Sequence, residues 1–188
     1  MKRVIAMRMI RRRRKESLTN YKKRIALLKS ELPRVIVRRS NRSISMQVAE
    51  YLPAGDRILA SANSKELQKF QWYPRSNIPT AYLTGLILAK KAKSLKSDGF
   101  VLDIGLNIPL KSSVVFAAAK GAVDGGMKIS NSIEFDAKRI SGTHISSYAG
   151  KLKEQGATKA FQGYAEMKVD PAKLHELFEN VKKRIMSE

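Results

Sequence analysis

The chain has 188 residues, of which 43% are hydrophobic, so it can form one folded domain around a buried core. It has no cysteine, which excludes disulfides and Cys-ligated zinc or iron–sulfur sites. His144 and His175 lie far apart in the sequence and cannot form a histidine-rich metal site without distant carboxylates. No run of about 18 apolar residues is present, and no apolar segment follows the N-terminal charges. We therefore expect an intracellular, cytoplasmic protein with no cofactor.

Positive charge is concentrated at the N-terminus. Residues 1–42 carry sixteen lysines or arginines and only two acids, a local charge of +14 out of the net +21. Charge at this density repels itself in a compact fold, whereas a polyanion neutralises it and releases condensed counterions. A transit peptide, a localisation signal or a solvated tail would also be basic. Because the charge continues into segments expected to fold, we favour nucleic-acid binding, with the candidates Arg11, Arg12, Arg13, Arg14, Lys15, Arg24, Arg34, Arg38, Arg39 and Arg42.

An arm and a short helix are expected first. Residues 1–15 have no sustained periodicity and predict an extended arm that orders only on binding. Thr19 is placed to cap a helix running to about Lys29, and Pro33 ends it.

Three short strands follow, over residues 34–38, 43–48 and 57–62, and their short links predict an antiparallel meander. Residues 43–48 alternate, which places Ile44, Met46 and Val48 on one face. If Arg34 and Arg38 align with the polar side of that strand, the sheet has one apolar face and one polar, basic face.

The rest of the chain alternates helices and strands. Pro79 opens a strong helix, residues 100–104 form an apolar strand, and Ser112 or Ser113 caps a helix that Gly125 stops. Residues 143–154 and the segment from Asp170 onward are expected to be helical. This order predicts an α/β fold with a mixed sheet.

The kind of nucleic acid is weakly constrained by composition. Signatures of zinc fingers, leucine zippers and ribonucleoprotein sheets are absent, and an arm beside a polar sheet face fits recognition of a folded RNA by shape and backbone. Phe70, Trp72, Tyr73 and Arg75 could stack on unpaired bases, although aromatic residues in such a segment more commonly anchor a loop to the core.

Asp103, in the sequence Asp-Ile-Gly after an expected strand, is the most enzyme-like residue. Ribonuclease H-like nucleases and some phosphate-handling ATPases place an Asp at such a strand, together with partner carboxylates on other elements. Asp56, Asp124 and Asp136 occupy turn or helix-end positions, where Asp commonly caps backbone groups. We expect no enzyme, and Asp103 to be a buried or capping acid; the alternative is a nuclease or ATPase that uses Asp103.

Seven segments occur in order over about residues 11–150: RRRR at 11–14, TNYKKRIALLKS at 19–30, PRVIVRRSN at 33–41, LASANS at 59–64, NIPTAYLTG at 77–85, VLDIGL at 101–106 and RISGTHI at 139–145. The ordered set resembles large-subunit ribosomal protein eighteen of the archaeal type. The last forty residues match less firmly; a C-terminal extension is typical of the archaeal and eukaryotic members.

The resemblance implies a ribonuclease H-like three-layer core without nuclease activity, which binds 5S ribosomal RNA and helps attach it to the large-subunit RNA in the central protuberance. Expected partners include neighbouring ribosomal proteins, among them another 5S-binding protein. In this family the basic N-terminal segment and the first sheet region approach RNA, which carries here to Arg11–Arg14, Tyr21, Arg24, Arg34, Arg38, Ser40, Asn41 and Arg42. The expected parts are a basic arm with a short helix (1–33), an RNA-binding α/β core (34–128) and a mostly helical C-terminal extension (129–188).

Overall fold

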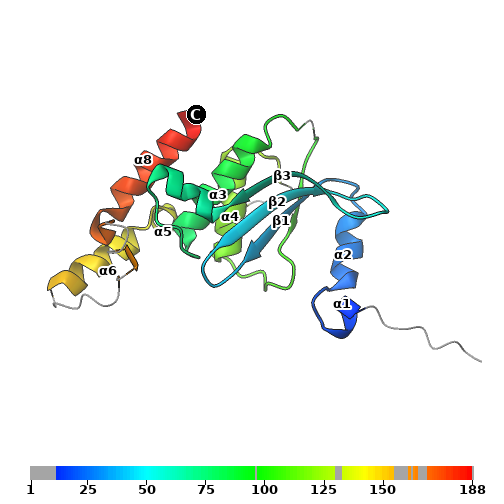
Figure 1. The fold of residues 1–188 in the computed structure, drawn as a ribbon, viewed down its shortest axis with the longest axis horizontal. Coiled ribbons are helices and arrows are strands. Elements are labelled where there is room, and N and C mark those ends of the chain that lie inside the picture. Colours follow the sequence, from blue (N-terminus) through cyan, green and yellow to red (C-terminus); the bar gives the residue numbers. More distant parts are fainter. Residues whose placement is uncertain are drawn as a thin grey trace, which may run out of the picture.

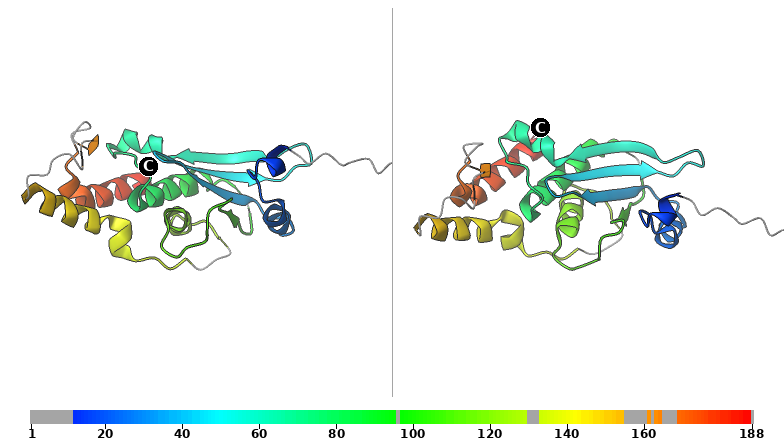
Figure 2. Two further views of the ribbon diagram at one scale, coloured as in Figure 1. Left: turned by 90° about the horizontal axis from the view of Figure 1, so that it is seen from below. Right: turned by 60° about the horizontal axis from the view of Figure 1, so that its bottom comes forward.

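The computed structural model describes residues 12–95, 97–129, 133–154, 161, 163–164 and 169–187. One four-stranded sheet has the order β3-β2-β1-β4, and helices α3 and α4 cover one of its faces (Figures 1 and 2). The described elements are α1 (Arg12–Lys15), α2 (Tyr21–Leu28), β1 (Arg34–Arg39), β2 (Ile44–Glu50), β3 (Arg57–Asn63), the 3₁₀ helix η1 (Ser64–Phe70), α3 (Ile78–Lys91), β4 (Val101–Asp103), α4 (Val114–Asp124), α5 (Ala137–Ser141), α6 (Thr143–Glu154), the 3₁₀ turn η3 (Pro171–Lys173) and α8 (Leu174–Ser187).

The predicted meander is confirmed. Strands β1, β2 and β3 pair antiparallel in sequence order, and Arg38 lies directly opposite Ser45. Directly opposed residues share a face of the sheet, so the basic side of β1 aligns with the polar side of β2. Val37 and Met46 are opposed in the same way and are fully buried on the other face. The expected alignment is therefore correct for Arg38, whereas Arg34 lies opposite Ala49 and is buried.

The sheet is mixed because β4 pairs parallel with β1, which places Asp103 opposite Ile36. Parallel partners need a long connection, and here it contains β2, β3 and α3. Helices α3 and α4 cross closely, since a Cβ atom on Gly121 would overlap the carbonyl oxygen of Tyr82. This close crossing completes the core beneath the apolar face.

The N-terminal segment differs from its prediction in two details. Asn20, and not Thr19, caps α2, because its Oδ1 accepts a hydrogen bond from the backbone N–H of Lys23 at 3.1 Å. The Thr19 hydroxyl instead accepts from Nε of Arg13 at 3.0 Å. Residues 12–15, expected to be extended, form one helical turn with an ion pair between Arg12 and Glu16. The rest of the predicted arm, residues 1–11, lies outside the described residues.

The C-terminal helix α8 packs on the core beside α3. Phe178 is buried, with its ring 6.3 Å from Trp72 and 5.7 Å from Tyr82. Helices α6 and α8 lie at the end of the molecule opposite α1 and α2 (Figure 2). In the described part of the chain, no helix has the length and apolar character that a membrane span requires.

Candidate nucleic-acid interface

Arg34 lies at the start of β1, between two carboxylates. Its Nη2 donates to Oδ2 of Asp56 at 2.6 Å, and its Nη1 donates to Oδ2 of Asp103 at 3.2 Å. Asp56 also receives two hydrogen bonds of 2.9 Å from Nη2 of Arg24, on helix α2. The Arg34 side chain is only 1% exposed, and a buried charge needs such partners. Arg34 thus ties α2 and the β2–β3 turn to the sheet.

Arg38 lies four residues after Arg34, on the same face of β1, and its side chain is more accessible than that of Arg34. Its Nη1 donates to the carbonyl oxygens of Val37 and Asp103, each at 2.9 Å, and its Nη2 donates to Oδ1 of Asp103 at 3.1 Å. Its side chain is nevertheless 47% exposed. The guanidinium is therefore fixed in orientation while part of it still faces solvent.

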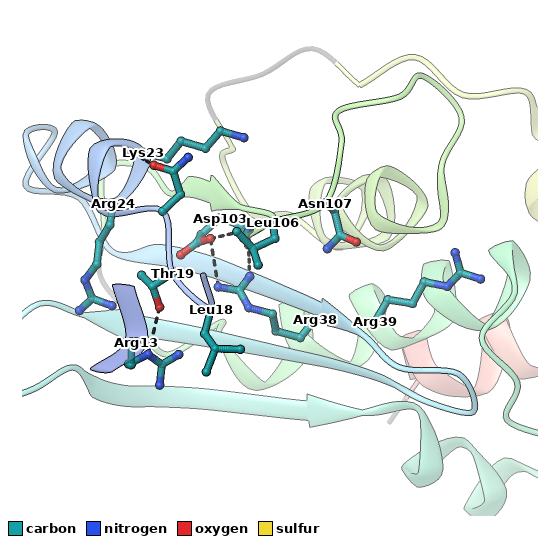
Figure 3. Close-up of a pocket in the computed structure, with 12 residues that line it drawn as sticks. Arg13, Leu18, Thr19, Lys23, Arg24, Arg38, Arg39, Asp103, Leu106 and Asn107 are labelled. Atoms are coloured by element: carbon teal, nitrogen blue, oxygen red, sulfur yellow. Dashed lines mark hydrogen bonds and ion pairs between the residues drawn. The ribbon is translucent and has the colours of Figure 1, made fainter. Parts of the chain in front are cut away.

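A pocket of about 250 Å³ opens over Arg38 and Asp103 (Figure 3). The N-terminal segment forms one wall, and the loop that follows β4 forms another. Five cationic side chains and several polar or apolar ones meet there; the lining residues are Arg13, Leu18, Thr19, Asn20, Lys23, Arg24, Arg38, Arg39, Asp103, Gly105, Leu106 and Asn107. The pocket carries more positive than negative side chains and suits an anionic ligand.

The cations of α1 lie on the surface beside this pocket. Arg12, Arg13, Arg14 and Lys15 are all exposed. The pair between Arg12 and Glu16 joins two well-exposed side chains, and such pairs contribute only about 0–1 kcal/mol. Arg12 can therefore exchange its carboxylate partner for a phosphate at little cost.

The turn after β1 holds the next predicted residues. The Ser40 hydroxyl donates to the carbonyl oxygen of Ser43 and accepts from its N–H, so it fixes the turn. Asn41 and Arg42 are exposed at its tip. Arg42 borders a second basic pocket together with Lys65, Gln68, Tyr73, Pro74, Arg75 and Gly163. The turn lies at the end of β1 away from Arg34, so the predicted residues form two groups rather than one.

Three further predicted residues complete the set. Arg39 donates from Nε to the hydroxyl of Ser76 at 3.0 Å and also lines the pocket of Figure 3. Tyr21 is the first residue of α2 and is partly buried. Arg11 lies outside the described residues.

The aromatic segment anchors the core at Trp72. The indole is 1% exposed, and its Nε1 donates to the Thr80 hydroxyl at 2.9 Å. Tyr73 is half-buried, packs edge-on against Tyr164 and carries the Arg75 guanidinium 4.8 Å above its ring. Trp72 is thus not accessible for stacking on a base in this structure.

Sequence reasoning did not pair the acids with the arginines. Asp56 was interpreted as a turn residue and Asp103 as a buried or capping acid, but both also pair with Arg34, and Asp103 accepts from the Gly105 N–H at 2.8 Å. The buried and capping role expected for Asp103 is therefore correct. The contribution of Leu18, Leu106 and Asn107 to the pocket has no sequence signal, because it arises where the loop after β4 meets the N-terminal segment.

Comparison with known proteins places the chain in a family. Residues 6–99 match the family model described as "Ribosomal large subunit proteins 60S L5, and 50S L18". The chain is 45% identical over 178 residues to a large ribosomal subunit protein uL18 from Korarchaeum cryptofilum, covering 93% of this chain and 91% of that protein. It is 42% identical over 180 residues to the uL18 protein of Thermofilum pendens, with 93% and 92% covered. The chain belongs to the family of ribosomal large-subunit proteins that comprises 60S L5 and 50S L18.

Proposed function

We propose that the chain is a structural constituent of the large ribosomal subunit that binds 5S ribosomal RNA and helps attach it to the large-subunit RNA in the central protuberance. The observation that carries the proposal is the meeting of the basic segment 12–24 with the basic face of β1 around one pocket. Family membership supports a ribosomal RNA as the polyanion. Another 5S-binding ribosomal protein is the expected neighbour.

The predicted residues divide into two roles under this proposal. The cations of the arm and of the end of β1 neutralise phosphates and so supply affinity; they are Arg11, which lies outside the described residues, and the exposed Arg12, Arg13, Arg14, Lys15, Arg39 and Arg42. Asn41 adds hydrogen bonds from the turn. The paired arginines Arg24, Arg34 and Arg38 hold the binding face in shape, and Ser40 does the same for the turn.

We also propose that residues 1–33 act as the RNA-binding arm, 34–128 as the α/β core and 129–188 as a helical extension. A ribonuclease H-like arrangement of the core fits the parallel pairing of β4 with β1 beside an antiparallel meander, and the parallel bridge between Phe100 and Ile129 next to β4. Tyr21 would approach RNA from the start of α2.

A structural role for Asp103 is favoured over a nuclease or ATPase role. Both of its carboxylate oxygens take part in ion pairs, one with Arg34 and one with Arg38. A carboxylate that ligates a metal ion would have to give up these partners. We therefore assign Asp103 to the support of the arginines.

The test is binding by the purified full chain to 5S ribosomal RNA and to duplex DNA of equal length, at one salt concentration. We expect 5S RNA to bind at least about tenfold more tightly, since specific complexes exceed non-specific ones by far more than that. Equal affinities would instead indicate a general RNA chaperone or DNA-compacting protein. Sedimentation of the chain with large subunits is the matching observation in extracts.

A further inference from the structure

We propose that the pocket over Arg38 holds a single unpaired nucleobase of the bound RNA, stacked on the open face of the Arg38 guanidinium. The inference rests on the proposed RNA binding and adds the kind of nucleotide that this pocket takes. Backbone contacts alone would make the chain a reader of duplex shape. A base pocket would also let it select a position where the RNA is unpaired.

One face of the Arg38 guanidinium is already covered. A Cβ atom built on Gly105 would lie 2.9 Å from Cζ, 3.0 Å from Nη1 and 3.2 Å from Nε of Arg38. Nearly equal distances to three atoms of the group place the glycine above its plane. Gly105 has a φ of +63°, which also favours glycine there. The glycine therefore backs the guanidinium, and a ligand can stack only on the opposite face.

The edge of the guanidinium is largely occupied as well. Three of its five N–H groups donate to Val37 and Asp103. A bidentate grip on phosphate uses this edge, so Arg38 is poorly arranged for it. A flat, oriented cation with one exposed face is instead suited to stacking on a π-system.

The pocket walls match the chemistry of a base. Leu18 and Leu106 are 53% and 58% exposed and line the pocket on either side of Arg38 in the view of Figure 3, where they can cover the rim of a ring. Asn20 and Asn107 also line it, and each amide carries both a donor and acceptors for a base edge.

The size and the surrounding charge limit the occupant to one nucleotide. At about 250 Å³ the pocket is slightly smaller than those that hold drug-sized ligands, roughly 300–1,000 Å³, so it suits a single base and not a duplex. Arg13, Lys23 and Arg39 at the margin are placed to meet the phosphates on either side of an extruded base. A phosphate alone would leave the apolar walls uncovered.

The experiment compares two RNA hairpins with the same stem, one fully paired and one with a single bulged nucleotide. The ratio of their dissociation constants is the readout. We expect the wild-type chain to prefer the bulged hairpin by about two- to fivefold, the effect of one exposed cation–π contact. The preference should disappear when the bulge is abasic, because the sugar and phosphate remain but the base is gone.

Arg38→Lys keeps the charge and removes the plane, and Leu106→Ala removes an exposed wall; each should abolish the preference. Ile108 lies on the same loop, is 72% exposed and does not line the pocket, so Ile108→Ala is the matched control and should retain it. If Arg38→Lys unfolds the chain, Leu106→Ala still tests the base pocket, since it alters only a surface side chain and should leave the fold intact.

A bulge preference that is absent, survives removal of the base, or survives Leu106→Ala would overturn the inference. The hairpins do not depend on the identity of the natural RNA. Loss of 5S specificity with an intact bulge preference would therefore count against the proposed function alone, and the reverse pattern would count against the base pocket alone.

Discussion

Arg34 and Asp103, which stand 69 positions apart in the sequence, form an ion pair of 3.2 Å between adjacent parallel strands, with Arg34 almost completely buried. The pair joins the first strand of the meander to β4, and the hydrogen bonds of Asp103 to Arg38 and to the N–H of Gly105 extend it to the pocket. The basic face of the sheet is thus built around a carboxylate. Arg34 and Arg38 are therefore held in place by groups of the protein itself, without a bound RNA.

Replacement of Asp103 by asparagine is expected to lower the free energy of unfolding by about 3 kcal/mol. The substitution removes the charge with which both Arg34 and Arg38 pair. Arg34, only 1% exposed, would keep Asp56 as its one carboxylate partner and face an amide in place of Asp103. For a chain of this size the loss corresponds to a fall in melting temperature of roughly 6–12 °C. Asp98 is exposed, so Asp98→Asn is the control and should change stability by less than about 0.5 kcal/mol. An unchanged melting temperature for Asp103→Asn would contradict the anchoring role.

The arm is expected to control the salt dependence of RNA binding. Roughly eight phosphate contacts predict that log affinity falls with log salt at a slope near −7. Replacing Arg11–Arg14 by alanine should flatten this slope by about three units, as measured by RNA binding over a salt titration. The four corresponding lysine substitutions keep the charge and should keep the slope. If the alanine variant retains the wild-type slope, the arm is not in the interface.

The three strands of the meander could be predicted from the sequence because apolar and polar residues alternate in β2 and short turns join the strands. Ile44, Met46 and Val48 lie every second residue and are completely buried, so the buried face of β2 follows from hydrophobicity alone. The irregular register with β3 at Val48 and Ala49 does not. Charge density located the basic arm. The cap of α2 was misplaced by one residue because Thr19 and Asn20 are both good caps and only geometry selects between them.

The pairing of distant charges could not be predicted from the sequence. Alternation placed Arg34 and Arg38 on one face, but nothing in the sequence showed which acids would meet them. Arg34 is buried between Asp56 and Asp103, and Arg38 lines the pocket. Asp103 reaches this face because β4 pairs with β1 in parallel. The position of α8 could not be predicted either: the sequence indicated a C-terminal helix but not that Phe178 would pack against Trp72 and Tyr82.

The close crossing of α3 and α4 is expected to make Gly121 intolerant of a side chain. Replacing Gly by Ala in a helix interior normally raises the free energy of unfolding by up to about 1 kcal/mol. At Gly121 the added methyl group would overlap the Tyr82 carbonyl, so we expect a loss of about 1–3 kcal/mol from overpacking. Gly150 in α6 has no atom within 4 Å of the corresponding position, so Gly150→Ala should stabilise the chain or leave it unchanged. Chemical denaturation of both variants measures the contrast; similar effects of the two substitutions would argue against the crossing.

Alkaline pH is expected to weaken the fold through Tyr82. Burial of its ring, followed by its 2.9 Å hydrogen bond to Oδ2 of Asp124, raises the pKa of the Tyr82 phenol well above its ordinary value of 10.0. A phenol whose pKa rises on folding stabilises the folded state fully below pH 10.0, where the unfolded chain also keeps the proton. The contribution is lost as the pH rises beyond that value, at up to about 1.4 kcal/mol per pH unit.

Tyr82→Phe separates this effect from other alkaline titrations. The variant should lose about 1–2 kcal/mol near neutral pH, because the hydrogen bond to a carboxylate is gone, and the gap to wild type should close above pH 10. Tyr51 is exposed, and Tyr51→Phe should leave the stability at neutral pH unchanged. Denaturant unfolding at a series of pH values gives both quantities. A gap between wild type and Tyr82→Phe that stays constant with pH would show that the phenol ionises equally in the folded and unfolded chains, and would remove Tyr82 as the source of alkaline sensitivity.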